Sequence, residues 1–160
     1  MTQVRPAPAA SSSPPAEVAE RARRIVAEFA ALGDWLDRYR YVVASGEGMA
    51  HLGNEQRTEA NRLPGCQYGL WIACEYDAAA GMLHFRADSD AKITRGLAAL
   101  ILRVLDGLPP GVVADADLTF LDTIGLRAHL SSQRGDGLDA MIHEIRRRAR
   151  HYRDTGTELP

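Results

Sequence analysis

Apolar residues in the first third of the chain recur at the three- and four-residue spacing of an amphipathic helix. The first stripe consists of Val18, Ala22, Ile25, Val26, Phe29 and Leu32. It predicts a helix that stops at Gly33. A second stripe consists of Trp35, Leu36, Tyr39, Val42 and Val43. It predicts a short helix whose N-terminus is capped by the side chain of Asp34.

The spacing of apolar residues changes in the middle of the chain, from the period of a helix to that of strands. The segments QYGLWIACEYD (67–77) and GMLHFRADS (81–89) are rich in aromatic and β-branched residues. The sequence AAAG, where the two segments meet, predicts the turn of a β-hairpin. The polar and irregular segment 46–62 predicts a long loop, and we expect a further short strand just before Pro64.

The second half of the chain predicts three more helices. The first carries an apolar stripe formed by Ile93, Leu97, Leu100, Ile101, Val104 and Leu105. Asp88, Ser89 or Asp90 can cap its start, and the following glycine and prolines stop it. A small helix is predicted around residues 118–126. The last helix, with Asp136 as its predicted cap, has a solvated, arginine-rich end. Its apolar stripe consists of Leu138, Met141, Ile142, Ile145 and Ala149.

This order of elements, two helices, a hairpin and then helices, predicts the architecture of the chain. We expect an α+β fold in which a small antiparallel sheet of about three strands is covered by helices on one face. Residues 1–16 are rich in Pro, Ala and Ser, and we expect them to form a disordered tail. One domain is predicted to span residues 17–153, followed by a short C-terminal tail over residues 154–160.

Composition and charge exclude several classes of protein. The 160 residues are 46% hydrophobic and 25% charged, which is typical of a globular domain. The net charge of -2 offers no basic surface for nucleic acid. No apolar run is long enough to span a membrane, and the N-terminus lacks the apolar core of a secretory signal, so we expect a cytoplasmic protein. The two cysteines exclude a disulfide framework, and with the scattered histidines they show no metal-ligand spacing.

One of the two cysteines follows a turn sequence, Leu63-Pro64-Gly65-Cys66. Proline and glycine fit the two central positions of a type II turn, so Cys66 would lie at the end of the turn, where a strand begins. Gly65 leaves room for another protein to approach, and Arg62 is near enough in sequence to stabilise a thiolate. A reactive thiol and a small buried hydrophobic residue are both open interpretations of Cys66.

The surroundings of the cysteines limit the chemistry further. Cys74 alternates with apolar residues on one strand face, and we expect it in the core. No histidine stands next to Cys66 as a base, and His51 would reach it only through the fold. The chain has no nucleophile elbow, no G-x-G-x-x-G and no P-loop. A thiol without these accessories fits a carrier better than a complete enzyme.

Three segments, NRLPGCQYGLWI, FRADSDAKITRGLAALIL and LRAHLSSQRGDGLDAMIHEIRRRA, add a family resemblance. They resemble the active-cysteine loop, the D-S-D-A-x-I-x-x-G-L segment and the C-terminal motif of the SufE family, the sulfur acceptors of cysteine desulfurases. Trp35 and Tyr39 look like that family's early W-x-x-x-Y helix. Two departures are Tyr68 and Gly69, where the family commonly has a small polar residue and then Gln. The resemblance covers residues 18–149.

The resemblance implies an α+β fold of the SufE/NifU type and a persulfide carrier without a cofactor or metal of its own. Cys66 would take sulfur from a pyridoxal-phosphate cysteine desulfurase of the SufS kind, stimulate that enzyme, and deliver the sulfur to an iron–sulfur cluster assembly scaffold of the SufBCD kind. By motif, Arg134 would favour the thiolate or contact the desulfurase, Asp90 would hydrogen-bond the loop, and Gly65 and Gln67 would shape the loop. A surface ion pair for Arg134 and a helix cap for Asp90 stay open.

The carrier interpretation includes a resting position for the thiol, and three other functions stay open as alternatives to it. We expect the Cys66 loop to hold its sulfur in an apolar cavity at rest and to swing out when the desulfurase docks. A NifU-like zinc or iron–sulfur scaffold would need more thiolate ligands. A stand-alone cysteine-dependent enzyme would act without a partner. A binding module would tolerate the loss of the thiol.

Overall fold

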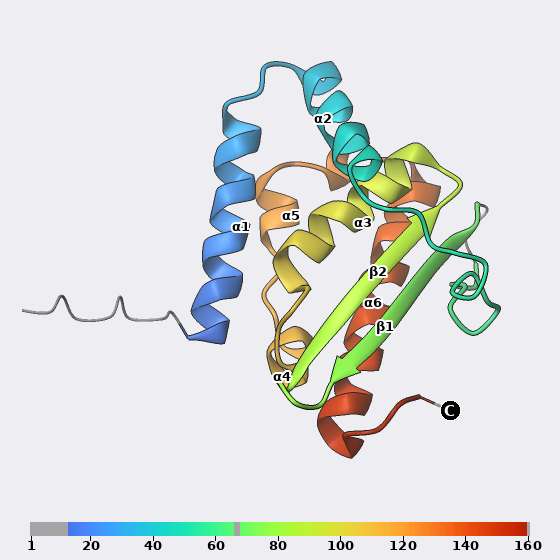
Figure 1. Ribbon diagram of the computed structural model, residues 1–160. Coiled ribbons are helices and arrows are strands. Elements are labelled where there is room, and N and C mark those ends of the chain that lie inside the picture. The colour runs from blue at the N-terminus through green and yellow to red at the C-terminus, as the bar shows by residue number, and fades with distance from the viewer. Residues whose placement is uncertain (1–12, 66–67, 160) are drawn as a thin grey trace, which may run out of the picture.

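The computed structural model describes residues 13–65 and 68–159 of the chain (Figure 1). Within these ranges a two-stranded hairpin is combined with helices that precede and follow it, so the predicted α+β class is confirmed. In chain order the elements are α1 (Pro14–Ala30), α2 (Trp35–Glu47), β1 (Leu70–Asp77), β2 (Met82–Ser89), α3 (Lys92–Leu105), α4 (Pro110–Ala114), α5 (Phe120–Thr123), the 3-10 helix η1 (Arg127–His129) and α6 (Ser132–Thr155).

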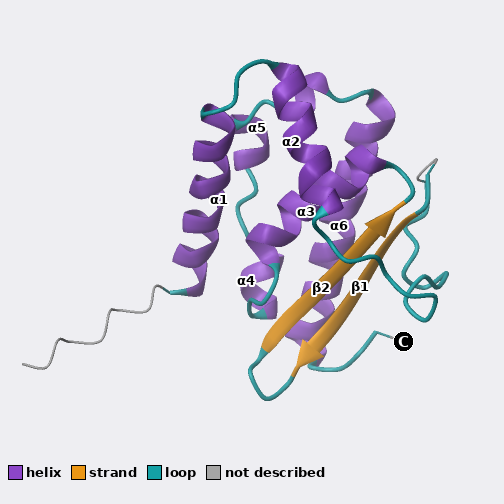
Figure 2. Ribbon diagram, turned by 45° about the horizontal axis from the view of Figure 1, so that its top comes forward, coloured by secondary structure: helices purple, strands orange, loops and turns teal. Residues whose placement is uncertain are grey.

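The hairpin is antiparallel, with Leu70 opposite Ser89 at one end and Asp77 opposite Met82 at the other. Every second residue of β2 from Met82 to Arg86 is exposed, and the residues between them are buried. This alternation places one face of the hairpin toward the core. Figure 2 shows that the helices lie on that one side of the strands, as the sequence predicts.

The predicted third strand is wrong. The segment before Pro64 forms only an isolated bridge, between Arg62 and Trp71, at the edge of β1. A second isolated bridge joins Leu83 of β2 to Leu108 at the other edge. Pro64 has no backbone N–H to continue a ladder, so pairing stops after one bridge and the sheet has two strands in the described part of the chain.

Helix α3 forms the centre of the core. Its apolar stripe is buried as predicted, and both Leu100 and Leu105 have no exposed surface. The helix contacts α1, α2, α6 and β2. The backbones of α2 and α3 meet at Gly46 and Gly96, where a Cβ on Gly96 would overlap the carbonyl group of Val42. Because a side chain at this crossing would push the helices apart, α3 is held rigidly behind the hairpin.

The helix caps confirm one prediction and correct two. Asp34 caps α2, and its carboxylate accepts a backbone N–H at 3.0 Å. Ala91 occupies the cap position of α3 and provides no side-chain cap, while the hydroxyl of nearby Ser89 accepts the Ala91 N–H at 3.2 Å. Ser131, rather than Asp136, caps α6 by accepting the N–H of Arg134 at 3.4 Å. Asp136 therefore lies inside the helix.

The extents of the first and last helices also differ from the prediction. α1 begins at Pro14, within the segment predicted as a disordered tail, because proline suits the first turn of a helix. Residues 1–12 of that predicted tail lie outside the described residues. α6 continues to Thr155, beyond the predicted end of the domain at residue 153. No helix in the described ranges has the length and apolar character required to cross a membrane.

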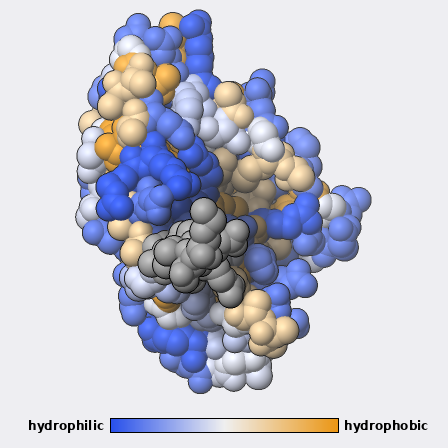
Figure 3. Space-filling model, turned by 60° about the vertical axis from the view of Figure 1, so that its left-hand side comes forward, coloured by the Kyte–Doolittle hydropathy of each residue, from blue (hydrophilic) through white to orange (hydrophobic). Residues whose placement is uncertain are grey.

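An apolar groove lies between α1 and the α4–α5 segment. Its volume is about 940 Å³, and its walls include Val18, Val26, Val112 and Phe120. In Figure 3 apolar residues gather around a hollow on the side of the molecule that this view brings forward. α1 and the segment that leads to β1 lie on opposite sides of the ribbon in Figure 1, so the groove is separate from the predicted cysteine site.

Candidate functional site

The predicted active segment is a loop closed by two paired stems. We call residues 64–69 the cysteine loop, residues 61–63 its incoming stem and residues 70–72 its outgoing stem. The Leu63 N–H donates to the Leu70 carbonyl at 2.9 Å, and the Ile72 N–H donates to the Asn61 carbonyl at 2.9 Å. Leu63 and Leu70 are buried. The base of the loop is therefore fixed to the core. Cys66 and Gln67 lie outside the described residues.

Gly65 has the backbone conformation that the turn sequence predicts. Its φ is +80°, in the left-handed region that favours glycine. No described atom outside its neighbours lies within 4 Å of the position that a Cβ would take. Together with Glu59, Arg62 and Pro64, it borders a polar cavity of about 440 Å³. Among the residues that the structure describes, none fills the space beside Gly65.

The outgoing end of the loop is tied to the start of α3. The Gly69 carbonyl accepts the N–H of Asp90 at 3.0 Å and the hydroxyl of Ser89 at 2.8 Å. A Cβ on Gly69 would overlap the Trp71 ring and the Asp90 carboxylate. This close packing explains why glycine stands at a position where the family resemblance leads one to expect glutamine. The Ser89 hydroxyl donates to the loop and also accepts the N–H of Ala91 at 3.2 Å, so it joins the loop to the start of α3.

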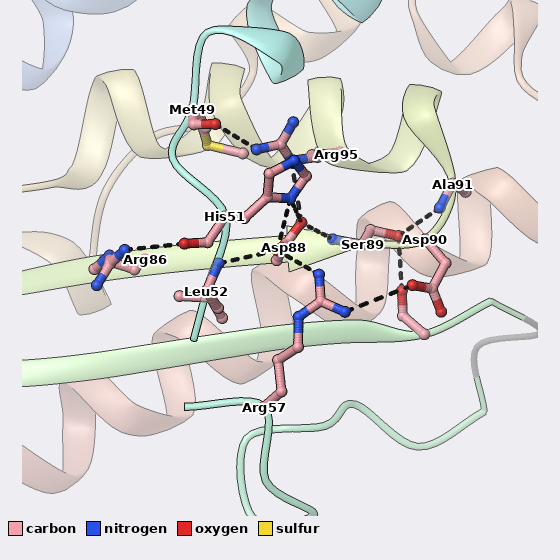
Figure 4. Close-up of polar contacts among 11 residues, drawn as sticks. Met49, His51, Leu52, Arg57, Arg86, Asp88, Ser89, Asp90, Ala91 and Arg95 are labelled. Atoms are coloured by element: carbon pink, nitrogen blue, oxygen red, sulfur yellow. Dashed lines mark hydrogen bonds and ion pairs between the residues drawn. The ribbon is translucent and has the colours of Figure 1, made fainter. Parts of the chain in front are cut away.

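Asp88 organises the residues behind the loop (Figure 4). Its carboxylate is fully buried and accepts the N–H of Leu52 at 3.0 Å, the N–H of Ser89 at 2.9 Å and the guanidinium of Arg57 at 2.6 Å. His51 Nδ1 lies 3.1 Å from one carboxylate oxygen, and Arg95 Nε lies 3.1 Å from the other. We call Asp88 with these partners the Asp88 cluster.

The Asp88 cluster keeps this carboxylate ionised. Burial alone would raise the pKa of Asp88, but the hydrogen bonds from Arg57, Leu52, His51 and Ser89 outweigh burial and lower the pKa to about 2. Asp88 has the register of an outward-facing residue on β2, yet the loop at 51–57 covers it. The buried carboxylate of Asp88 therefore joins the polar segment 46–62, which we call the polar loop, to the end of the sheet.

Arg57 extends from the Asp88 cluster to the cysteine loop. Its guanidinium carbon lies 4.7 Å from the centre of the Trp71 ring, and its Nη1 is 3.8 Å from the carboxylate of Asp90. Arg62 approaches the same ring, with its guanidinium carbon 5.9 Å from the centre. Trp71 of the outgoing stem is thus contacted by one arginine from the polar loop and by another from the incoming stem.

The incoming stem is held by α6. Arg148 is 5% exposed, donates to the Ala60 carbonyl and to Asn61 Oδ1 at 3.2 Å each, and forms an ion pair with Glu144 at 2.7 Å. Asn61 in turn donates its side-chain N–H to the Gln56 carbonyl at 2.8 Å. The predicted arginine-rich end of this helix is therefore only partly solvated, because one of its arginines is buried against the loop.

The structure brings some of the predicted site residues together and leaves one apart. Asp90 and Gly65 lie at opposite ends of the cysteine loop, and the Asp90 side chain is 58% exposed. Arg134 is half-buried in the first turn of α6. Its guanidinium forms no hydrogen bond or ion pair with any described residue, so the surface ion pair considered for it is not found there. No described contact joins Arg134 to Asp90 or Gly65.

Cys74 lies on the core-facing side of β1, as predicted, and is half-buried. Burial raises the pKa of its thiol to about 12, with Arg148 acting in the opposite direction. Because the thiolate is the nucleophilic form, this cysteine is suited to packing rather than to sulfur chemistry.

Sequence reasoning missed Asp88, Arg57, Asn61 and Arg148 as parts of the site. The pattern assigned Asp88 to a helix cap and the polar segment 46–62 to an irregular loop. Neither assignment shows that the loop folds back over the strand end. The only signal in the sequence was an Asp at a strand end together with an arginine in an earlier polar loop. The number of residues between two such groups is not fixed, so no motif identifies the pair.

Comparison with known proteins gives a consistent result. The family model described as SufE, Fe-S metabolism associated domain, matches residues 23–149. An uncharacterized SufE-like protein of Rhizobium etli is 38% identical over 130 residues, which cover 79% of this chain and 88% of the relative. An uncharacterized SufE-like protein of Rhizobium meliloti is 38% identical over 129 residues, covering 79% of this chain and 92% of the relative.

A solved structure shares the fold. The solution structure of a hypothetical protein from Thermus thermophilus superposes with a TM-score of 0.69 at 18% identity, covering 84% of this chain and 97% of that chain. The family match and the two relatives support a sulfur-transfer role in iron–sulfur metabolism. With most of its length matched by the family model, the chain belongs to the SufE family.

Proposed function

We propose that this protein is a persulfide carrier that accepts sulfur on Cys66 from a pyridoxal-phosphate cysteine desulfurase. Membership of the SufE family over residues 23–149 is the observation that carries the proposal. The paired stems support it, because they hold both ends of the segment that contains Cys66 at the edge of the sheet. The open space beside Gly65 would let the persulfide of a docked enzyme approach the thiol.

The transfer is an exchange between sulfur atoms and needs no external oxidant or reductant. The Cys66 thiolate attacks the outer sulfur of the enzyme's cysteine persulfide, and a new S–S bond forms as the old one breaks. The desulfurase cysteine leaves as a thiolate, which takes up the proton released by the Cys66 thiol. Cys66 then carries the persulfide, and the desulfurase is free for another cycle. Removal of its bound sulfur would explain stimulation of the enzyme.

The surroundings of the loop favour a thiolate. Arg62, in the incoming stem, has a side chain that is 45% exposed, and its ion pair with Glu59 is long at 4.0 Å. The N-terminus of α3 follows the Gly69–Asp90 hydrogen bond, so the positive end of the helix dipole lies beside the outgoing stem. Positive charge near a cysteine lowers the pKa of its thiol.

The remaining predicted residues take supporting roles in this proposal. Arg134, whose guanidinium has no described partner, is available to a thiolate or to the desulfurase. The exposed carboxylate of Asp90 is available to a basic group of the partner. Gly65 and Gln67 shape the loop. We expect the loop to swing between a protected and an exposed position. We also expect the protein to be cytoplasmic, and an iron–sulfur scaffold of the SufBCD kind to receive the sulfur.

Intact-mass measurement tests the proposal directly. The protein is incubated with a SufS-type desulfurase and L-cysteine, and a gain of about 32 Da per sulfur that a thiol reductant removes is expected. Cys66→Ser should abolish both the gain and the stimulation of the desulfurase. Cys74→Ser is the matched control and should retain both. A mass gain that persists in Cys66→Ser, or that is absent from the unaltered protein, would refute the carrier.

A further inference from the structure

Arg57 connects the buried carboxylate of Asp88 with the stems of the cysteine loop. It donates to Asp88 at 2.6 Å and lies over the Trp71 ring, which Arg62 of the incoming stem also approaches. We infer that Arg57 is a positioning residue for sulfur transfer: by holding the Trp71 ring it fixes the direction in which the cysteine loop leaves its stems. The inference deepens the proposed function and rests on it.

Arg57 is anchored to a buried, hydrogen-bonded carboxylate, which is the first requirement for such a role. Asp88 is fully buried, belongs to β2 and accepts hydrogen bonds from backbone groups on both sides of it. The Arg57 side chain is 29% exposed, so one edge of the guanidinium binds the buried carboxylate while its face covers the indole. A planar guanidinium can do both at once, whereas a lysine ammonium cannot.

Trp71 is placed to transmit the position of Arg57 to the loop, which is the second requirement. Its backbone lies between Leu70 and Ile72, both of which pair with the incoming stem. Its ring packs so closely on Gly69 that a Cβ there would overlap it. Gly69 is the last residue of the cysteine loop, so any displacement of the ring moves the outgoing end of the loop directly.

Arg57 could instead serve only to anchor the polar loop, and a comparison with Arg86 distinguishes this role from positioning of the cysteine loop. Arg86 binds the same polar loop: it donates to the His51 carbonyl at 3.3 Å (Figure 4). It also donates to the Gln56 side chain at 2.9 Å. No described contact joins it to Asp88 or Trp71. If Arg57 only tied down the polar loop, Arg57→Lys and Arg86→Lys would have similar effects on Cys66.

The experiment compares Arg57→Lys with Arg86→Lys, each made in the unaltered protein and in Trp71→Leu. One measurement is the rate at which iodoacetamide alkylates Cys66 without desulfurase, resolved by peptide mass across a range of about pH 6–9. The other is single-turnover formation of the Cys66 persulfide at saturating desulfurase. Lysine keeps the positive charge, so a change reports on geometry. Melting temperatures establish that each variant is folded.

Arg57→Lys is expected to raise the alkylation rate and to lower the rate of sulfur acceptance, each by about fivefold. A loosened loop exposes its thiol more often but presents it less often in the aligned position. The pH midpoint of alkylation should not move, and Arg86→Lys should match the unaltered protein. In Trp71→Leu, the step from Arg57 to Lys should have no further effect, because the transmitting ring is gone.

Three results would overturn the inference: equal effects of Arg57→Lys and Arg86→Lys, an undiminished effect of Arg57→Lys in Trp71→Leu, or a shifted pH midpoint with an unchanged limiting rate. Should Trp71→Leu fail to fold, Trp71→Phe keeps the comparison, with a smaller but still reduced effect of Arg57→Lys expected. If the unaltered protein accepts no sulfur, the proposed function fails, while the alkylation series still decides whether Arg57 positions the loop.

Discussion

The two ends of the β1–β2 hairpin are built in different ways. Within the turn residues 77–81 the bonds are local: one Asp77 carboxylate oxygen accepts the N–H groups of Ala79 and Ala80, and the Gly81 N–H donates to the Asp77 carbonyl. Just beyond the turn, Leu83 pairs with the backbone of Leu108. At the loop end, by contrast, the stems are held by groups from distant segments. These are Arg57 of the polar loop, Ser89 and Asp90 before α3, and Arg148 of α6.

The difference shows which end of the hairpin carries interactions beyond those needed to connect its two strands. A chain reversal needs only a few local hydrogen bonds and a glycine with positive φ, and the turn residues 77–81 have both. The loop end adds a fully buried carboxylate, whose desolvation is costly unless several donors compensate it. Such a cluster is unnecessary for joining two strands. It is consistent with a loop whose direction matters for chemistry.

The largest expected difference between the two ends is in the stability lost when the carboxylate of Asp88 or that of Asp77 is removed. Asp88→Ala leaves the guanidinium groups of Arg57 and Arg95 without their buried partner, and a loss of about 3–5 kcal/mol in the free energy of unfolding is expected. Asp77→Ala removes only exposed local bonds and should cost much less. Urea unfolding at neutral pH measures both.

The same variants also test where stability is lost. Hydrogen exchange of Asp88→Ala should show the Leu63 and Ile72 amides losing protection before the amides near Gly81. Similar unfolding free energies for Asp88→Ala and Asp77→Ala would show instead that the two ends of the hairpin are held equally.

Sequence reasoning succeeds at the turn end because its bonds are local. The segments 67–77 and 81–89 and the AAAG turn predict the hairpin, and the structure places β1 and β2 within them. The helical stripe of α3 is likewise confirmed. In each case the signal is a period of two or of 3.6 residues that neighbouring residues carry together.

At the loop end the same reasoning fails, since the partners are far apart in the chain. Asp88 looks like a helix cap because a carboxylate before a helix is usually one, yet its oxygens are taken by Arg57 and Leu52, more than thirty residues earlier. Arginines surround Arg148 in the sequence, which suggests a solvated side chain. In the structure it instead donates to Asn61, 87 residues earlier in the chain. No local period encodes such pairs.

Acid should sharpen the comparison by weakening the loop end selectively. The pKa of folded Asp88, about 2, lies below the ordinary aspartate value of about 3.9. Its contribution to stability is therefore complete above about pH 5 and is lost as the pH falls from about 4 through about 2. Over this window the unaltered protein should lose about 2 kcal/mol more stability than Asp88→Asn, which has no titrating group at this position.

Urea unfolding of both proteins, down to the lowest pH at which each remains folded, measures this difference. Glu28, whose pKa is also lowered to about 2, chiefly by its hydrogen bond from Arg103, titrates in both proteins and cancels. Parallel curves for the unaltered protein and Asp88→Asn would mean that Asp88 is not the acid-sensitive group of the loop end.

The smallest effect comes from a matched pair of glycines and separates stability from function. Gly65 and Gly81 have φ values of +80° and +69°, and no described atom beyond their neighbours crowds either Cβ position. Gly65→Ala and Gly81→Ala should therefore each cost about 1 kcal/mol of unfolding free energy through backbone strain alone. Only Gly65→Ala should slow persulfide formation on Cys66, because its methyl group stands where the donor must approach. Equal slowing by both variants would mean that the hairpin responds as one unit and that its loop end has no special role.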